Sequence, residues 1–163
     1  MTFCIIPSRQ GSKRLKNKNV VDFYGKPIIY YPIKESKKAK IFSNIYVSTD
    51  SKKIQIISEN YGAKTLGLRP KKYSDDYTNV KEVLLDFILS NNLQDTKYFC
   101  CIYPTSVLIT SKIIKKAFIK FKKENSDMLI TLCEFPSNPG RAFTIKKGKY
   151  ASFSNKKNQN IRS

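Results

Sequence analysis

The chain has 163 residues and contains no histidine and no tryptophan. The lack of histidine excludes His-based catalytic triads and zinc sites that depend on imidazole. Hydrophobic runs reach only the length of strands, well short of the ~18 residues that suggest a membrane span. The N-terminal residues enter a strand-like run directly and do not resemble a signal peptide. These absences predict a soluble cytoplasmic protein without a membrane partner.

Cysteine is also scarce, and the pattern CxxC is absent. Each cysteine stands inside an apolar, strand-like run, which predicts buried and reduced thiols in the core. The four cysteines are Cys4, Cys100, Cys101 and Cys133.

Acidic residues are few, 12 against 31 basic ones, so the net charge is +19. This charge leaves a basic nucleic-acid-binding domain as an alternative. The lysines, however, are spread along the chain among many Asn and Ile residues, as an AT-rich coding sequence would produce. Aromatic residues fall in strand interiors and apolar helix stripes rather than between lysines on one exposed face. We therefore expect no nucleic-acid partner.

Only five of the basic residues are arginines. Lysine cannot replace the planar guanidinium, which grips a phosphate or carboxylate with two hydrogen bonds. The arginines are therefore candidates for functional residues, with structural ion pairs as the alternative. They are Arg9, Arg14, Arg69, Arg141 and Arg162.

Strand-like and helix-like runs alternate along the chain. We predict strands at 2–6, 44–49, 98–103 and 128–133. We predict helices at 27–39, 52–62, 78–92 and 111–125. The alternation predicts one α/β domain over residues 1–163, a three-layer α/β/α fold with a mostly parallel sheet.

Two local features refine this fold prediction. The run 98–103 is so apolar that we expect a central strand buried on both faces. Asp50 or Ser51 is expected to cap the helix at 52–62. Ligands of such sheets bind outside the carboxyl ends of the strands, where the loop after the first strand lies.

That loop concentrates groups that bind anions. Backbone N–H groups can converge there, and Gly11 allows close approach. Ser12 adds a hydroxyl donor, while Arg9 and Lys13 add positive charge. Neither GxxxxGK[ST] nor GxGxxG is present, so the loop is not a P-loop or a dinucleotide fingerprint. The loop suits a polyphosphate, with a basic surface turn as the alternative.

Several spaced segments resemble the acylneuraminate cytidylyltransferase family. They occur in the family's order over nearly the whole chain, and they read IIPSRQGSKR, KNKN, GKPII, VSTD, YGA, LRP, SDDYT, CCIYPTS, EFPSNPGRAF and IRS. The resemblance is strongest to the pseudaminic acid branch, because Tyr103 stands where sialic acid synthetases usually have Gln. It implies a Rossmann-like nucleotidyltransferase fold of the nucleotide-diphospho-sugar transferase type.

The resemblance also implies a reaction. A cytidylyltransferase of this family moves CMP from CTP to a nonulosonic acid, here pseudaminic or sialic acid, and releases pyrophosphate. Mg²⁺ is the expected cofactor, and the full-length protein is expected to be a homodimer. The product would serve bacterial surface glycan biosynthesis.

Roles follow from the resemblance residue by residue. Arg9 and Lys13 would be catalytic, since they would stabilise charge on the leaving pyrophosphate. The nucleotide would be bound by Ser8, Arg9, Gly11, Ser12, Lys13, Asn19, Arg69 and Thr78, with Arg69 reading the cytosine. The sugar acid would meet Tyr103, Arg141 and Arg162.

The resemblance further implies that the chain lacks the family's C-terminal part, including the paired aspartates that bind Mg²⁺. We assign no metal ligand here: Asp50 has a helix cap as its simple role, and Asp75 and Asp76 have a solvated turn. Two outcomes stay open for this chain, an active transferase or a nucleotide-binding fragment without turnover. Gln10 replaces a family Gly, which requires a negative φ at that residue.

Overall fold

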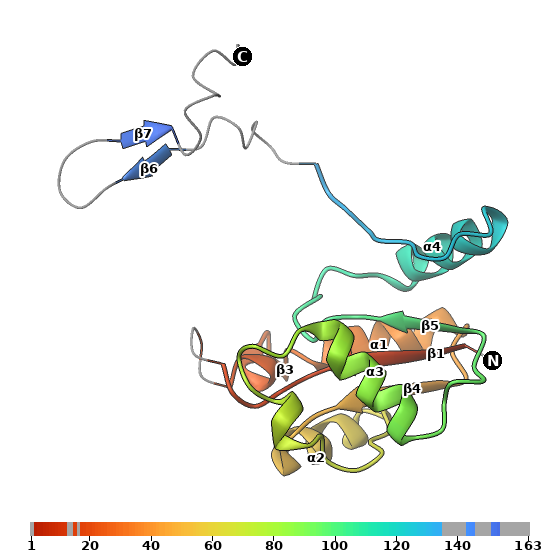
Figure 1. Ribbon diagram of the computed structural model, residues 1–163, viewed down its shortest axis with the longest axis horizontal. Coiled ribbons are helices and arrows are strands. Elements are labelled where there is room, and N and C mark those ends of the chain that lie inside the picture. The colour runs from red at the N-terminus through yellow and green to blue at the C-terminus, as the bar shows by residue number, and fades with distance from the viewer. Residues whose placement is uncertain (1, 13–14, 16, 135–142, 146–150, 154–163) are drawn as a thin grey trace. The chain divides into compact units, whose positions relative to one another are not determined.

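The structure is a computed structural model that describes residues 2–12, 15, 17–134, 143–145 and 151–153. It divides into two compact units, Met1–Ser126 and Asp127–Ser163, which we describe separately. The first unit contains the parallel sheet and the helices around it (Figure 1). In the second unit, β6 (Phe143–Ile145) and β7 (Ala151–Phe153) form an antiparallel hairpin.

The sheet of the first unit has three parallel strands in the order β4-β1-β5. They are β1 (Thr2–Pro7), β4 (Asn44–Ser48) and β5 (Tyr98–Cys101). Pro7 pairs with Ser48, so β1 and β4 end side by side. The predicted parallel sheet is confirmed, and the loop after β1 starts at its carboxyl edge.

Four helices surround this sheet: α1 (Tyr30–Ala39), α2 (Lys52–Asn60), α3 (Val80–Ser90) and α4 (Ser111–Lys123). Two short 3-10 turns, η1 (Lys18–Val20) and η2 (Lys71–Tyr73), lie in the connections. The last three helices agree with the predicted ranges to within a few residues. Of these helices, α2 ends as expected, because Gly62 follows it with φ of 86°.

The first helix was predicted to begin at Pro27, and this prediction is wrong. Pro27 belongs to β3 (Lys26–Pro27), which pairs with β2 (Asp22–Phe23) in a small antiparallel hairpin. Tyr24 and Gly25 form its turn with φ of 51° and 74°. Two consecutive positive φ values suit a tight hairpin turn, and this turn chemistry delays the helix to Tyr30.

Alternate residues of β1 face opposite layers of the fold. Cys4 and Ile6 belong to a cluster with residues of α1, α2 and α4, such as Ile33 and Ile114. Phe3 and Ile5 belong to a second cluster with Phe87 of α3. The period of two along the strand therefore places helices on both faces, which confirms the three-layer α/β/α prediction.

The strand predicted at 98–103 is shorter and less buried than expected. In the described part of the chain it is an edge strand, and the Phe99 side chain is 47% exposed although it stacks on Phe3. Cys100 and Cys101 are partly buried free thiols, and burial raises the pKa of each to about 11. Apolar composition alone therefore overestimated the burial of this strand.

The run 128–133 was predicted to be a strand, but the structure shows no strand there. Most of its apolar side chains, those of Met128, Ile130 and Leu132, are exposed, with Leu132 at 89%. Cys133 is also exposed, so the prediction of buried thiols is wrong for it, while Cys4 is buried as predicted. Strands of the first unit are stabilised by ladder partners, and no strand pairing among the described residues includes this run.

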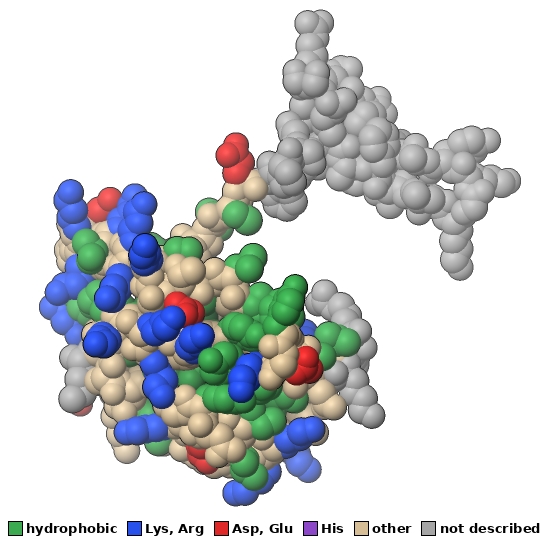
Figure 2. Space-filling view, turned by 180° about the vertical axis from the view of Figure 1, so that it is seen from behind, with side chains coloured by type: hydrophobic (Ala, Val, Ile, Leu, Met, Phe, Trp, Pro, Cys, Tyr) green, Lys and Arg blue, Asp and Glu red, His purple; other side chains and the backbone are tan. Residues whose placement is uncertain are grey.

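On the face of the first unit that Figure 2 shows, basic side chains lie at many separate places among polar and hydrophobic ones. This distribution agrees with the interpretation of the lysines as a solvated surface. Among the residues that the structure describes, no helix has the length and apolar character needed to cross a membrane.

Candidate functional site

The site lies at the carboxyl ends of β1 and β4, where the chain leaves the sheet at Ser8. The Ser8 amide donates to the Ser48 carbonyl at 2.8 Å and extends the pairing of the two strands by one residue. The Asn19 side chain amide then donates to the Arg9 carbonyl at 2.8 Å. The start of the loop is thus held by main-chain and side-chain bonds from two other segments.

Asp50 holds the next residue of this loop. Its Oδ1 accepts from the Gln10 amide at 2.8 Å. The N-cap position of α2 is Ser51, and no side-chain capping bond is present there. Ser51 therefore occupies the predicted N-cap position, but its side chain forms no capping bond, and the Asp50 carboxylate fixes the loop instead. Gln10 is not among the residues with positive φ, so the condition for replacing the family's Gly is met.

The Arg9 guanidinium extends to residues 75 and 76. Nη1 donates to the Asp75 carbonyl at 2.8 Å, and Nη2 donates to Asp76 Oδ1 at 2.6 Å. The two charged side chains keep exposed fractions of 32% and 29%. Asp76 is therefore more than part of a solvated turn, since it forms an ion pair with the predicted catalytic arginine.

Asp75 has the role predicted for it, in a turn. Its Oδ1 accepts from the Thr78 hydroxyl at 2.7 Å, the Thr78 amide at 2.7 Å and the Tyr77 amide at 3.0 Å. These bonds, that of the Thr78 hydroxyl first, hold the pKa of the Asp75 carboxyl below its usual range. The Thr78 hydroxyl, predicted to line the nucleotide, is thus bonded within the turn.

A cavity of about 450 Å³ lies between the loop after β1 and this turn. One wall, the basic wall, consists of Arg9, Gly11 and Ser12. The other, the acidic wall, consists of residues 74–77. A Cβ atom at Gly11 would meet only Arg9 Nη1, at 4.0 Å, among the described atoms. The space beside Gly11 is thus open to a ligand that approaches the backbone closely.

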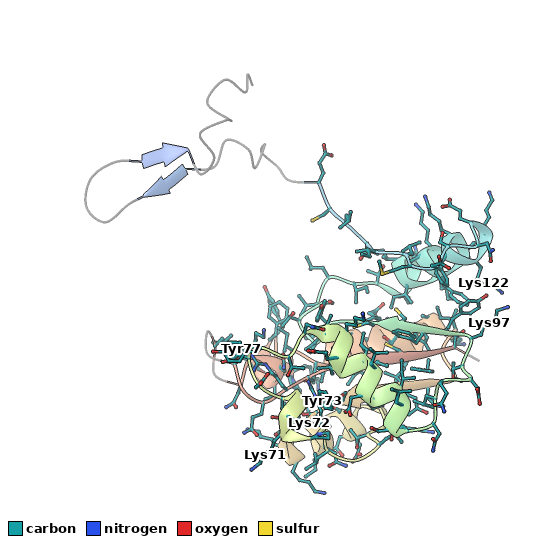
Figure 3. The ribbon with its side chains drawn as sticks, viewed as in Figure 1. Lys71, Lys72, Tyr73, Tyr77, Lys97 and Lys122 are labelled. Carbon is teal, nitrogen blue, oxygen red and sulfur yellow. The ribbon has the colours of Figure 1, made fainter. Side chains whose placement is uncertain are left out.

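Figure 3 shows where the segment of the acidic wall lies. Tyr77 is at the end of the sheet where β1 finishes, and Lys71, Lys72 and Tyr73 of η2 precede it along the chain. Tyr77 is 92% exposed. The wall therefore presents an aromatic ring to solvent and two lysines nearby in sequence, both suited to a nucleotide.

Arg69 ties the segment before this wall to β4. Its amide donates to the Thr49 carbonyl at 2.7 Å, and its Nη2 donates to the Ser48 carbonyl at 2.7 Å. Nη1 donates to the Tyr73 carbonyl at 3.3 Å. Burial is the main cause that lowers the pKa of Arg69. Both terminal nitrogens thus bind main-chain carbonyls, and the reading of cytosine by Arg69 stays a prediction.

Three buried polar atoms at this edge find no hydrogen-bond partner among the residues that the structure describes. They are Ser8 Oγ, Asn19 Oδ1 and Arg69 Nε. Buried polar atoms are normally paired with protein, water or ligand. All three belong to residues predicted to bind the nucleotide, so the unsatisfied atoms are where a polar ligand or its water is expected.

The structure brings most of the described candidates together. Contacts or the shared cavity join Ser8, Arg9, Gly11, Ser12, Asn19, Arg69 and Thr78. Tyr103 follows β5 at the same edge, where the Ile102 amide bonds the Ile5 carbonyl, and it is 53% exposed. Lys13, Arg141 and Arg162 lie outside the described residues.

The aspartates of this site are engaged in other contacts, which bears on the expected Mg²⁺. Asp50 accepts from Gln10, Asp75 closes its own turn, and Asp76 pairs with Arg9. No group of three or more His, Cys, Asp or Glu that could hold a metal ion occurs in the described part of the chain. These residues do not fit a metal site, and Mg²⁺ stays an expectation from the resemblance.

Sequence reasoning missed the roles of Asp50 and Asp76. The signal that could have revealed them is the scarcity of acids: with 12 acidic residues in the chain, acids beside the loop after β1 are unusual enough to expect specific partners.

The chain is also similar to known proteins. The chain matches the Cytidylyltransferase family over residues 3–161. It belongs to this family.

Two relatives of this chain illustrate the match. It is 36% identical over 162 residues to the pseudaminic acid cytidylyltransferase of Campylobacter jejuni, with 98% of this chain and 70% of that protein covered. It is also 36% identical to a Helicobacter pylori protein named "Pseudaminic acid cytidylyltransferase and UDP-2,4-diacetamido-2,4,6-trideoxy-beta-L-altropyranose hydrolase", with 97% of this chain covered. The chain spans 31% of that second protein.

A solved structure supports the fold of this chain. A CMP:2-keto-3-deoxy-manno-octonic acid synthetase complexed with CTP matches with a TM-score of 0.63 at 17% identity. The match covers 77% of this chain and 48% of that one, so the chain spans about half of its structural relative. The predicted Rossmann-like nucleotidyltransferase fold is confirmed.

Proposed function

We propose that this chain forms the CTP-binding part of a transferase that moves CMP to a nonulosonic acid, pseudaminic or sialic. One observation carries the proposal: Arg9, Gly11 and Ser12 line one cavity at the carboxyl edge of β1. A triphosphate needs positive charge and N–H donors in a loop that lets it approach the backbone. The names of the relatives support cytidine as the base and a nine-carbon sugar acid as the acceptor.

The reaction forms a bond between the anomeric oxygen of the sugar acid and the α-phosphorus of CTP. The bond from this phosphorus to the oxygen shared with the β-phosphate breaks, and pyrophosphate leaves with that oxygen. The sugar hydroxyl gives its proton to solvent or to a base. The described residues contribute position and charge: Arg9 donates toward the phosphates, and the bonds from Ser48 and Asp50 hold the loop that carries it.

Further parts of the proposal rest on the family resemblance. Lys13 would assist Arg9 at the pyrophosphate, and Tyr103, Arg141 and Arg162 would meet the sugar acid. We also propose a cytoplasmic location, a homodimer of the full-length protein, and no nucleic-acid partner.

Two measurements test the proposal. Calorimetry should detect binding of CTP, while a single-stranded DNA oligonucleotide at physiological salt should compete poorly for the protein. Pyrophosphate release should then be followed with CTP, Mg²⁺ and either pseudaminic or N-acetylneuraminic acid. CTP binding with acid-dependent release would establish a transferase, and CTP binding alone would establish a nucleotide-binding fragment. A chain that binds DNA but not CTP would contradict the proposal.

A further inference from the structure

The cavity proposed to take the triphosphate has acidic residues in one wall. Asp75 and Asp76 face the loop of Arg9, Gly11 and Ser12 across this cavity. Two adjacent carboxylates beside a polyphosphate site are unexpected in a chain with only 12 acidic residues against 31 basic ones. A like charge opposes phosphate binding unless it has a specific use.

The two aspartates differ in what holds them. The Asp75 carboxylate is fixed by hydrogen bonds within its own turn, to Tyr77 and Thr78. The segment after the turn is fixed separately, because Asn79 and Glu82 form a capping box at the start of α3. The turn therefore does not depend on the bond between Asp76 and Arg9 for its shape.

The Asp76 carboxylate holds the group that should bind phosphate. It accepts from Arg9 Nη2 at 2.6 Å, while Nη1 is held by the Asp75 carbonyl at 2.8 Å. About a third of each charged side chain is exposed, with 32% for Arg9 and 29% for Asp76. Ion pairs at this exposure are weak and can exchange with a stronger anion. A triphosphate, which carries several negative charges, is such an anion for a guanidinium fork.

We propose that Asp76 is a displaceable anion, which holds Arg9 in the nucleotide-free protein and gives it up to a phosphate of CTP. The inference rests on the proposed function and adds a residue that sets affinity. A nucleotide that must first displace Asp76 binds with an apparent Kd equal to its intrinsic Kd divided by the fraction of protein in which Arg9 is released. Removing the charge of Asp76 should therefore tighten CTP binding.

The test compares wild type with Asp76→Asn and Asp76→Ala by calorimetry. The Asn variant keeps the shape of the side chain and removes its charge, and the Ala variant removes the contact altogether. If Arg9 is held in most molecules, both variants should bind CTP about 3–10-fold more tightly than wild type. Cytidine, which has no phosphate, should bind all three proteins equally. Asp95→Asn is the control for net charge, and it should bind CTP as wild type does.

The outcomes separate this inference from the proposed function. Equal or weaker CTP binding by both Asp76 variants, with measurable binding by wild type, would overturn the exchange and would make Asp76 a support for Arg9. An equal gain for cytidine and CTP would also overturn it, since a general change of the cavity would then be the cause. If wild type binds no CTP, the proposed function fails and the exchange fails with it.

Discussion

The two walls of the cavity are held in place by different means. The basic wall is tied to distant segments, through Ser8 to Ser48 and through Gln10 to Asp50. The acidic wall is a local turn, closed by the carboxylate of Asp75. Arg9 bridges the two. The geometry of the basic wall therefore depends on tertiary contacts, whereas the acidic wall keeps its shape through bonds within its own turn.

The largest effect is expected from Arg9→Ala, which removes the charge of the basic wall. Loss of a charge-assisted bond to phosphate should cost ~1.5–3 kcal/mol, or roughly 10–150-fold in CTP affinity. Calorimetry measures this directly. Lys97→Ala removes the same charge near the opposite end of the sheet (Figure 3) and should bind CTP normally. If Arg9→Ala binds CTP as tightly as wild type, the assignment of this loop to the CTP site is wrong.

Arg69→Lys should come next, because it keeps the charge but loses the planar fork that bonds Ser48 and Tyr73. Two lost bonds to carbonyls should lower the free energy of unfolding by ~1–3 kcal/mol. If Arg69 also reads the base, the preference for CTP over UTP should fall. Thermal denaturation and paired nucleotide titrations separate the two roles. A destabilised variant with the parent's CTP/UTP ratio would make Arg69 structural only.

A smaller effect is expected from Asp50→Ala, which leaves the Gln10 amide without its acceptor. Loss of one loop bond should reduce CTP affinity by ~2–10-fold, corresponding to ~0.5–1.5 kcal/mol. Asp50→Asn is the matched control, since its amide oxygen can still accept from Gln10. If the Ala and Asn variants bind CTP equally, the bond does not position the loop.

The smallest effect is expected in the acidic wall, where the ionisation of Asp75 makes the stability of the folded state depend on pH. The pKa of Asp75 is lowered chiefly by the Thr78 hydroxyl, so the ionised carboxylate stabilises the folded state. This contribution is fully present above the ordinary carboxyl pKa of about 4 and is lost as pH falls through the lower folded-state pKa. Thr78→Val should raise the Asp75 titration midpoint measured by NMR. Thr105→Val should leave it unchanged, and an unmoved midpoint in Thr78→Val would contradict the assignment.

Much of the fold could be predicted from the sequence because the signals were local. The alternation of Phe3 and Ile5 with Cys4 and Ile6 is a period of two, and it needs no knowledge of partners to place helices on both faces. The predictions failed where the burial of a residue depends on which segments pack against it. Phe99 is as apolar as Phe3, yet in the described structure Phe99 lies on an edge strand and Phe3 on the strand between two others.

The candidate site likewise combines features that local sequence predicts with contacts that depend on the fold. The residue types of the loop after the first strand could be read directly from the sequence, since Arg9, Gly11 and Ser12 lie close together in the chain. The turn of Asp75 and Thr78 could be predicted in the same way, because its partners lie within a few residues. The bond from Gln10 to Asp50 and the ion pair of Arg9 with Asp76 follow from the folded structure alone, since they join residues separated by 40 and 67 positions. A carboxylate can cap a helix, close a turn or pair with a cation. Which donor lies within hydrogen-bond distance of it depends on how the fold brings the ends of the strands together.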